Sequence, residues 1–494
     1  MPHAPAHPVP GPLTPTLPYD LGPRAAAATR DVRLQQFVNA ATLSKDRARR
    51  AAFDASFGVR ADDLRDLAAR IKQHTLDHLD HYLERFDAAA RARGTVVHYA
   101  ADAAEANRIV VDLARARGCR RCVKSKSMLT EETGLVPALE AAGVRAVETD
   151  LGEFILQIDG DAPSHIVTPM IHKDRAAVGR AFQRALGVPY TDEPAALAAI
   201  ARRHLRDAFR RADLGVSGGN FLIAETGELV LCTNEGNGRL STSCPPIHVA
   251  LVGIEKLIPR RADLAVMLKL LARSATAQPL TCYTSIIGGP RAPSEPDGPR
   301  EVHVVLVDNG RVALLADETR ELLRCIRCGA CLNACPVYRK IGGHAYGSVY
   351  SGPIGAVLTP PLKGLANYPD LPHASSLCGA CVEACPVKID IPRQLIRLRT
   401  EMVRRRIAPA GGRFLMRAWA WVLRSPRRYR AALALQRALL RALADDLPPH
   451  ASPYASRGWI AHALGPLAGW TSQRDLPTPT PLAFRDWWRR RETP

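Results

Sequence analysis

The first 418 residues of this 494-residue chain contain no tryptophan, and all six Trp lie between Trp419 and Trp488. Lysine is missing from residues 401–494, where 17 Arg stand against six acidic residues, so the larger part of the net charge of +19 belongs to this end. A chain of this length exceeds what one ordinary hydrophobic core supports. The composition therefore predicts two or three domains, of which the last differs from the others.

Long apolar runs are missing as well. No stretch approaches the roughly 18–20 uninterrupted apolar residues that a membrane-spanning helix needs, which excludes such a helix. Residues 1–24 contain eight Pro and no apolar run, so we expect residues 1–30 to form a disordered, Pro-rich tail and not a signal peptide. Since 47% of all residues are apolar, the rest of the chain is expected to fold. Without a signal peptide or a membrane-spanning run, the cytoplasm is its expected location.

Residues 31–317 show the alternation of an α/β domain. Residues 61–94 have the apolar spacing of an amphipathic helix, and short strand and helix patterns alternate after it. The predicted strands are Thr95–Tyr99, Cys119–Val123 and Val144–Glu148, and the predicted helices are Asp102–Arg117 and Thr130–Ala142. Strands separated by helices of this length indicate a parallel sheet.

Further strand patterns follow in the same domain. Phe221–Ala224 and Leu229–Cys232 flank a Glu-Thr-Gly-Glu turn, which predicts a hairpin added to that sheet. Val249–Ile258 and His303–Val307 are expected to be later strands.

Two more regions complete the chain. Residues 318–400 begin with a short helix and show few strand patterns, which favours a helical, loop-rich domain. Residues 401–494 have a helical pattern to about Ala444 and then Pro-rich coil. Arg417 and Arg424 flank Trp419 and Trp421, and this basic amphipathic stretch is typical of helices that meet a partner or a membrane surface.

Seven of the twelve cysteines lie in two tight groups, which suits metal ligation in a reducing compartment better than a disulfide framework. The first group has the spacing C-x2-C-x2-C-x3-C-P of bacterial ferredoxins, with Cys325, Cys328, Cys331 and Cys335. Three thiolates at this spacing surround one face of a cubane cluster, and the fourth points to the other cluster. Structural zinc is the alternative, but zinc sites usually use two separated pairs. The pattern therefore favours a [4Fe-4S] cluster.

The second group begins 43 residues after Cys335, with Cys378, Cys381 and Cys385, and it has Ser375 where the leading Cys would stand. Crossed ligation then predicts that cluster 1 takes Cys325, Cys328, Cys331 and Cys385, and that cluster 2 takes Cys335, Cys378 and Cys381. Two [4Fe-4S] clusters have eight iron corners, each of which needs a ligand, and only seven thiolates are present. The open corner suits Ser375, His373, a partner protein, solvent or a three-iron cluster.

Two clusters in one small domain indicate single-electron relay. The segment His344–Pro353 between the two groups is polar, aromatic and Gly-rich, and it is interpreted as a loop that covers the clusters.

Other candidates lie in the α/β domain. Lys124–Ser127 follows a strand and precedes a helix, which suits either an anion site or an ordinary loop. Gly215–Asn220 is a candidate for close approach to a ligand but lacks the G-x-G-x-x-G fingerprint, so a nicotinamide cofactor is poorly supported. Cys119 and Cys122 are interpreted as structural thiols. The carboxylates that suit either catalysis or the surface are Glu225, Glu228 and Glu235.

These motifs together resemble the lactate-utilisation protein B family, an iron–sulfur component of bacterial L-lactate oxidation. The matching segments are Val123–Met128, Glu148–Glu153, Gly215–Asn220, Cys325–His344 and Ser375–Pro386, and the Arg-Asp-Trp-Trp ending is also similar. The resemblance implies a lactate-utilisation (LUD) domain of the isomerase and CoA-transferase-like α/β class, then an α-helical ferredoxin-type domain. In that family Ser commonly replaces the first Cys of the second motif.

The resemblance implies that electrons from L-lactate, oxidised to pyruvate, pass through the two clusters. The implied partners are a cysteine-rich CCG-domain subunit and a second LUD-domain subunit. Because no flavin fingerprint appears, this chain is expected to be the relay and not the place where the lactate C–H bond breaks. An alternative keeps the relay and changes the donor to another 2-hydroxy acid such as glycolate. A nucleic-acid-binding regulator is a second alternative, although the basic end fits no DNA-reading motif.

Overall fold

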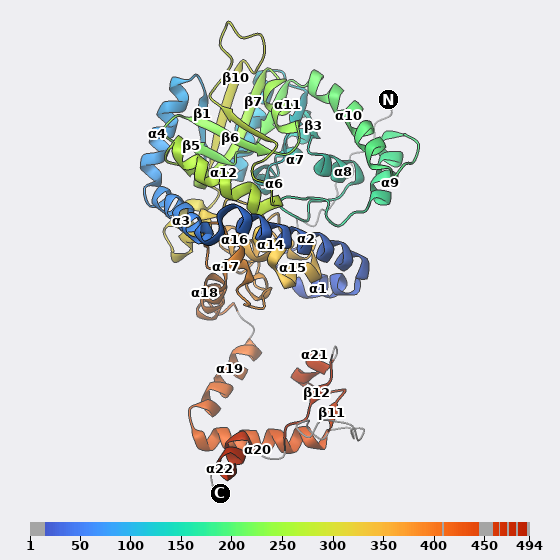
Figure 1. Cartoon of the computed structure of the whole chain (residues 1–494), viewed down its shortest axis with the longest axis vertical. Helices are drawn as coiled ribbons and strands as arrows, with labels where there is room; N and C mark the ends of the chain where they lie inside the picture. Colours follow the sequence, from blue (N-terminus) through green and yellow to red (C-terminus); the bar gives the residue numbers. More distant parts are fainter. Residues whose placement is uncertain are drawn as a thin grey trace. The chain divides into compact units, whose positions relative to one another are not determined.

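The computed structural model describes residues 15–407, 410–443, 458–463, 465–471, 474–480 and 483–491. The chain forms two compact units, Met1–Ile407 and Ala408–Pro494, and each is described by itself (Figure 1). Residues 1–14 of the predicted tail lie outside the described residues. Among the described residues, no helix is both long and apolar enough to cross a bilayer.

A six-stranded sheet forms the centre of the α/β part. All its neighbouring strands are parallel, as the alternation of strands and helices predicts. In spatial order the strands are β1 (Val96–Ala100), β10 (Glu301–Val307), β7 (Ile247–Gly253), β4 (Leu214–Ser217), β2 (Arg121–Lys124) and β3 (Arg145–Glu148). Every residue of β7 is buried, as expected for a central parallel strand covered on both faces.

Helices cover this sheet and connect its strands. They are α4 (Leu79–Ala92), α5 (Ala103–Ala116), α6 (Met128–Thr133), α7 (Leu135–Ala141), α8 (Leu151–Asp159), α9 (Arg175–Leu186), α10 (Pro194–Arg211), α11 (Asn237–Ser243) and α13 (Arg311–Leu315). Helix α5 shows the local logic: Asp102 accepts a hydrogen bond from the backbone N–H of Glu105 and caps the start, and the buried residues Ala106, Val110 and Ala114 repeat every fourth position.

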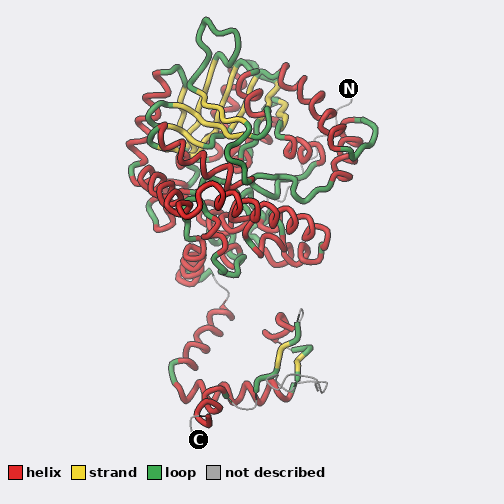
Figure 2. The backbone as a smooth tube through the Cα atoms, viewed as in Figure 1, coloured by secondary structure: helices red, strands yellow, loops and turns green. Residues whose placement is uncertain are grey.

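The predicted hairpin belongs to a second sheet, so its addition to the parallel sheet was wrong. This four-stranded sheet has the order β8 (Leu257–Ile258), β5 (Phe221–Ile223), β6 (Glu228–Thr233) and β9 (Tyr283–Ile287). Strands β5 and β6 are antiparallel, as the turn predicts. Both sheets lie in the same part of the unit, surrounded by helices (Figure 2).

Strands β8 and β5 and most of β6 are buried on both faces because their side chains alternate between two cores, whereas the edge strand β9 is partly exposed. Leu222 and Leu229 face the six-stranded sheet and α4, whereas Phe221, Ile223 and Val230 face α12 (Arg261–Thr276) and the cysteine region. The second sheet therefore separates the parallel sheet from the cysteine region. This position makes a binding site between the two parts possible.

The predicted helix over residues 61–94 is two helices, α3 (Ala61–Asp77) and α4, with His78 in a non-helical conformation between them. The break has a packing reason. Ala68 and Leu76 of α3 lie in the core of the cysteine region, whereas Tyr82 and Phe86 of α4 lie against the sheets. One straight helix would present a single apolar stripe to one core. A break at His78 lets α3 and α4 turn their apolar faces toward different cores.

The cysteine region is helical and loop-rich, as predicted. Its elements are η3 (Glu318–Arg324), α14 (Ala330–Ala334), α15 (Pro336–Ile341), η4 (His344–Tyr346), α16 (Gly352–Lys363), η5 (Leu371–His373), α17 (Ala380–Ala384) and α18 (Ile391–Arg404). Helix α18 crosses the expected boundary at residue 400, because Leu398 and Met402 continue its buried face.

The N-terminal helices α1 (Leu21–Arg30) and α2 (Val32–Phe57), with η1 (Gly58–Arg60), belong to the same core as the cysteines. Helix α2 packs both with α14 and α15 of the cysteine region and with α12 (Arg261–Thr276) of the α/β part. One expectation was wrong, because residues 21–30 are helical and not disordered. The reason is anchoring. Tyr19 is 2% exposed, and its hydroxyl donates to the carbonyl of Ala345, while Asp20 caps α1.

The second unit has helices at its start, as predicted. Its elements are α19 (Ala410–Leu423), α20 (Pro426–Ala442), β11 (Trp459–Ile460), η6 (Gly465–Leu467), α21 (Ala468–Thr471), β12 (Leu476–Pro477) and α22 (Phe484–Arg491). Strands β11 and β12 pair in a short antiparallel ribbon that the sequence did not predict.

Candidate metal centre and the adjoining cavity

The two cysteine motifs fold as matched turns. Arg327 and Leu377 occupy equivalent positions and both have positive φ, 60° and 55°. Gly329 and Gly379 follow them, also with positive φ, 76° and 82°, and start the five-residue helices α14 and α17. The internal repeat of the sequence is therefore a repeat of backbone conformation as well.

Four thiols from the two motifs surround one small cavity. Cys325, Cys328 and Cys331 come from the first motif, and Cys385 comes from the second. The remaining wall is mostly apolar, with Ile166, Ile326, Ile354, Pro386, Val387, Ile389 and Ile391, and it also includes Arg327. These four cysteines are the set that crossed ligation requires for cluster 1.

The other three cysteines form a second group. Their thiols lie close enough to interact: Cys378 raises the pKa of Cys335, and Cys335 and Cys378 raise the pKa of Cys381, in each case after the larger effect of burial. Helix α14 carries Cys331 and leads into Cys335, so ligands of both groups lie about one helical turn apart, roughly 6 Å along the axis.

Ser375 occupies the place of the missing cysteine. The backbone N–H of Leu377 donates to Ser375 Oγ at 3.1 Å, and the N–H of Arg327 donates to Cys325 Sγ at 3.4 Å. The same backbone turn therefore presents an oxygen at one group and a sulfur at the other. His373, the other candidate in this chain, is exposed on η5.

The surroundings of the thiols suit a metal cluster. Burial raises the pKa of Cys328, Cys331 and Cys385, and it raises that of Cys381 to about 12. Buried thiolates need a compensating positive charge, which iron supplies. Backbone N–H groups also donate to sulfur at 3.4 Å, from Tyr338 to Cys335 and from Ile389 to Cys385, and such bonds tune cluster potentials. The residues present therefore fit iron–sulfur clusters.

A larger cavity, of about 390 Å³, adjoins the first group of thiols. Two segments that the sequence singled out meet in its wall: Ser125–Ser127 after β2 and Gly218–Asn220 after β4. A Cβ on Gly218 would lie 2.6 Å from Ser127 Oγ, so this close approach requires glycine. The opposite wall includes Arg327 and Cys328 of the first cysteine motif. The cavity thus connects the α/β part with the first thiol group.

A buried ionic network forms the wall of this cavity beside the thiols. Arg311 Nε lies 2.7 Å from Glu255 Oε2, and its Nη2 lies 2.9 Å from Glu132 Oε2; all three side chains are at most 2% exposed. The hydroxyl of Tyr350 donates to Glu132, and the Arg327 guanidinium lies 4.5 Å from the Tyr350 ring centre. Sequence reasoning missed these residues, because scattered charged positions carry no motif.

Lys124 does not serve the cavity, so the anion interpretation fails for this residue. Its buried ammonium lies 2.8 Å from Glu148, 3.0 Å from Glu131 and 3.6 Å from Glu153. Burial alone would lower the pKa of Lys124, but these carboxylates raise it well above the usual value. Three carboxylates grouped here would also suit a cation, but the ammonium already occupies their centre. Lys126 remains in the cavity wall.

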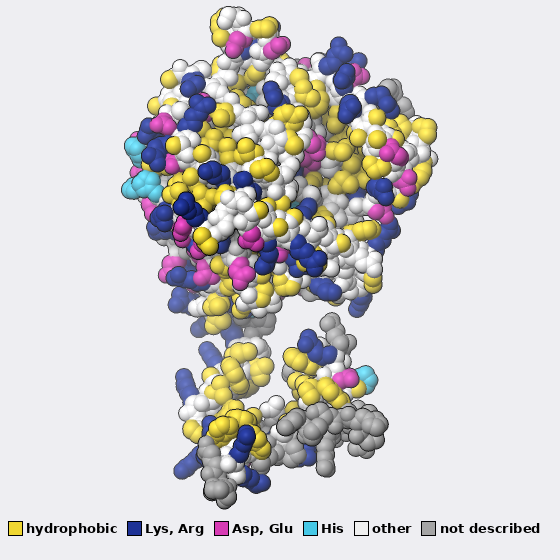
Figure 3. Space-filling view, in the orientation of Figure 1, with side chains coloured by type: hydrophobic (Ala, Val, Ile, Leu, Met, Phe, Trp, Pro, Cys, Tyr) yellow, Lys and Arg dark blue, Asp and Glu magenta, His cyan; other side chains and the backbone are white. Residues whose placement is uncertain are grey.

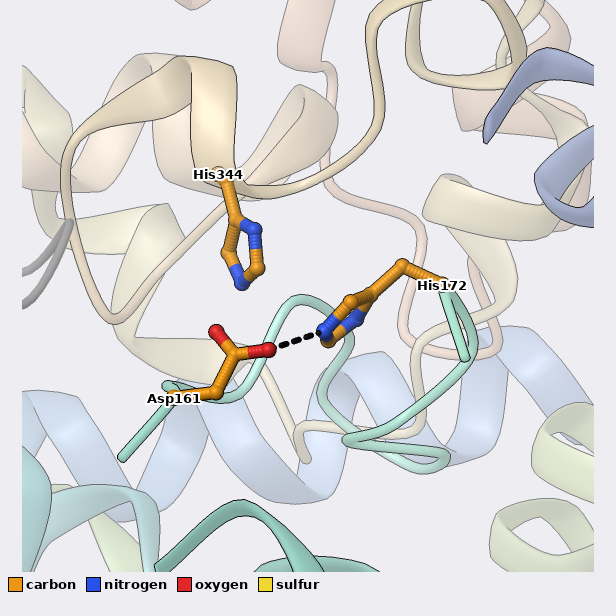
Figure 4. A group of neighbouring side chains, drawn as sticks. All are labelled: Asp161, His172 and His344. Carbon is orange, nitrogen blue, oxygen red and sulfur yellow. Dashed lines mark hydrogen bonds and ion pairs between the residues drawn. The ribbon is translucent and has the colours of Figure 1, made fainter. Parts of the chain in front are cut away.

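A second group with metal-ligand chemistry consists of Asp161, His172 and His344. Figure 4 shows both imidazoles beside the Asp161 carboxylate, with His172 Nε2 at 2.9 Å from it. Lys173 Nζ lies 2.6 Å from the same carboxylate, and His344 Nε2 lies 2.8 Å from the carbonyl of Ala162. The charge that a cation would neutralise is already paired, so the group joins the α/β part to η4 without a metal.

The remaining sequence candidates lie elsewhere. Cys119 and Cys122 are buried in the core beside the parallel sheet, which agrees with structural thiols. Glu225 accepts a hydrogen bond from the backbone of Arg261 outside the cavity, whereas Glu235 lines it. In the segment predicted to cover the clusters, Tyr346 and Tyr350 are buried.

Comparison with known families assigns each region. Residues 83–307 match the LUD domain, residues 321–389 match the 4Fe-4S dicluster domain, and residues 401–493 match the C-terminal domain of lactate utilisation protein B. A curated lactate utilization protein B from Oceanobacillus iheyensis is 44% identical over 431 residues, which is 87% of this chain and 88% of that protein.

The chain belongs to the lactate utilization protein B family. Its relative from Geobacillus kaustophilus is 45% identical over 433 residues, 87% of this chain and 89% of that protein, and the one from Bacillus cereus AH820 is 43% identical over 430 residues, 87% and 88%. A solved structure of a DUF162 family protein from Deinococcus radiodurans covers 46% of this chain and 98% of its own, at 16% identity and a TM-score of 0.26, too low to carry an argument. Membership in this family confirms the resemblance drawn from the motifs.

Proposed function

We propose that this chain is the electron-relay subunit of a complex that oxidises L-lactate to pyruvate, with release of two electrons and two protons. The observation that supports it most is the meeting of four thiols from two distant motifs around one apolar cavity, in a chain of the lactate utilization protein B family. When bound there, [4Fe-4S] clusters accept and release one electron at a time.

The ligand sets follow from the two thiol groups. We assign Cys325, Cys328, Cys331 and Cys385 to cluster 1, and Cys335, Cys378 and Cys381 to cluster 2. Ser375 is the proposed fourth ligand of cluster 2, because the backbone holds its oxygen where the first motif holds the Cys325 sulfur. These thiols must remain reduced, which suits a cytoplasmic complex.

The exposure of the thiols suggests a direction for the relay. Cys378 is exposed, whereas Cys328 and Cys385 are buried, and Cys328 lines the large cavity. We propose that electrons enter at cluster 1 and leave through cluster 2, which an acceptor protein can approach at the exposed Cys378.

The C-terminal unit is proposed to dock the partner subunits, a cysteine-rich CCG-domain protein and a second LUD-domain protein. Helix α19 has no buried residue, and Phe414, Trp419 and Trp421 are each more than half exposed. Arg428 lies 4.2 Å from the ring centre of Trp421, and Figure 3 shows apolar and basic side chains interspersed on this unit. We also propose the isomerase and CoA-transferase-like class for the α/β part.

Anaerobic metal analysis tests the relay. We expect about eight iron and eight sulfide per chain, and reduction of the visible cluster absorbance when L-lactate is added to the chain with its two partner subunits. Zinc without sulfide would overturn the assignment.

The donor is tested separately. In the same assay glycolate is expected to reduce the clusters far less than L-lactate. A strain that lacks this chain and other lactate dehydrogenases is expected not to grow on L-lactate. Normal growth there, or faster reduction by glycolate, would favour the relay for another 2-hydroxy acid.

The Ser375 assignment predicts the effect of two variants. Ser375→Ala removes the oxygen and is expected to lower the iron content from about eight to about seven per chain, with the EPR signal of an oxidised three-iron cluster. Ser375→Cys is expected to keep about eight iron and to make cluster 2 resist iron loss in air. His373→Ala is the control and should behave as wild type. An unchanged iron content in Ser375→Ala would place the fourth ligand elsewhere.

A further inference from the structure

The large cavity contains positive charge that the ion pairs of the protein only partly neutralise. Lys126, Lys256, Arg311 and Arg327 line it, as do the acidic residues Asp150, Glu235 and Glu255. Arg311 is paired with Glu132 and Glu255, and Lys126 donates to the carbonyl of Val167 and lies 3.7 Å from Asp150. Lys256 and Arg327 are left.

Neither of these two cations is fully satisfied within the described part of the chain. Nη1 of Arg327 is buried without a hydrogen-bond partner, although the whole side chain is only 9% exposed, and its Nη2 reaches Glu255 at 3.5 Å. The ammonium of Lys256 has neither a hydrogen bond nor an ion pair among these residues. Buried polar groups normally have partners, and an orphaned charged donor is costly. The two side chains also repel each other, since each is a cation in the same wall.

The rest of the cavity limits what an occupant can be. Asp150, Glu235 and Glu255 would repel a dianion, so Lys256 and the partly paired Arg327 suit a single negative charge. Leu231, Leu271 and Ala272 offer apolar contacts to the body of a ligand. Hydroxyl and amide groups of Ser127 and Asn220 reach the same space. Such a mixture of apolar walls and few polar groups is typical of small-molecule sites.

We propose that this cavity is a binding site for a small organic carboxylate, whose carboxylate group is held by Lys256 and by Nη1 of Arg327. The site lies on the α/β side of Cys328, so a bound carboxylate sits beside the first thiol group. Its place in electron transfer rests on the proposed function, whereas carboxylate binding itself does not.

Binding is tested by calorimetry on the full chain, purified anaerobically with its clusters. The probes are L-lactate, pyruvate and inorganic phosphate. Wild type is expected to bind at least one of the two carboxylates and to bind phosphate more weakly. Lys256→Gln is expected to raise the Kd of that carboxylate at least about tenfold, because a charge-assisted hydrogen bond is lost.

The matched control is Lys269→Gln, on the exposed face of helix α12, which should bind as wild type. Lys256→Arg restores the charge and is expected to recover most of the affinity, so a fold defect in Lys256→Gln is separated from a lost contact. The EPR spectrum of the reduced wild-type protein is also expected to change when the carboxylate is added, since it would sit beside Cys328.

Three outcomes would overturn the site: no carboxylate binding by wild type with full iron content, equal Kd values in Lys256→Gln and wild type, or tighter binding of phosphate. Failure of the proposed electron relay can be distinguished from failure of the carboxylate site. Carboxylate binding without cluster reduction in the complete complex would contradict the proposed function and leave the site standing.

Discussion

Cys385→Ala is expected to disrupt cluster 1, although Cys385 belongs to the second motif. The iron content should fall from about eight to about seven per chain or fewer, because the three remaining thiols hold at most a three-iron cluster, and lactate-dependent electron transfer should be lost. Alanine is used because the Ser375 assignment makes serine a possible ligand. The physical reason is the shared cavity: the Cys385 thiol lies with those of the first motif and not with its sequence neighbours.

Reference variants make this prediction sharp. Cys328→Ala defines the spectrum of a protein with a disrupted cluster 1, and Cys378→Ala defines that of a protein with a disrupted cluster 2. The EPR spectrum of Cys385→Ala should match the first, and that of Cys335→Ala should match the second. Cys119→Ala, a buried thiol in the α/β core, should keep both clusters. If the spectrum of Cys385→Ala instead matched that of Cys378→Ala, and that of Cys335→Ala matched that of Cys328→Ala, each motif would hold its own cluster.

Arg311→Met is expected to give the largest loss of stability, about 3–5 kcal/mol in the free energy of unfolding. Arg311, Glu132 and Glu255 are all at most 2% exposed, so the substitution leaves two carboxylates buried without their main partner. The measurement is anaerobic urea unfolding, followed by far-UV circular dichroism. Arg261→Met, whose side chain is 59% exposed and 3.9 Å from Glu228, should cost less than about 1 kcal/mol.

The loss should depend on pH. Burial alone would raise the pKa of Glu255, but Arg311 and neighbouring cations lower it to about 2. The wild type therefore gains stability from this carboxylate above its unfolded pKa, near 4.5, and loses it as the pH falls toward 2. In Arg311→Met the orphaned carboxylates take up protons more readily, so the difference between the proteins should narrow below about pH 5. A gap that is constant with pH would contradict the ionic account.

Much of the fold could be predicted from local sequence patterns. The three strands and the first helix between residues 95 and 148 follow from apolar periodicity, and the spacing of the cysteines by itself indicates the cluster chemistry. The predicted helix Thr130–Ala142 is instead two helices, α6 and α7, because Gly134 between them is left-handed, with φ 70°. Residues 21–30 were mispredicted because proline content suggests disorder, whereas Tyr19 and Leu21 lie in the cysteine core and anchor the helix α1. The hairpin was recognised but not its sheet, because a turn fixes which strands pair locally and not which core their faces cover.

The candidate site also has a part that the sequence predicts and a part that only the packing decides. The spacing of the cysteines and the place of Ser375 are local properties, so the sequence alone determined that this chain has two ferredoxin-type motifs with seven thiols. Crossed ligation also predicted that Cys385 joins the first motif, and the cavity agrees with it. Only the tertiary structure brought Lys256 of the α/β part to the wall of the cavity that Arg327 and Cys328 line. The reason is physical: ligand spacing is set by a few backbone torsions, whereas a cavity forms where separate elements pack, and no local pattern records which ones meet.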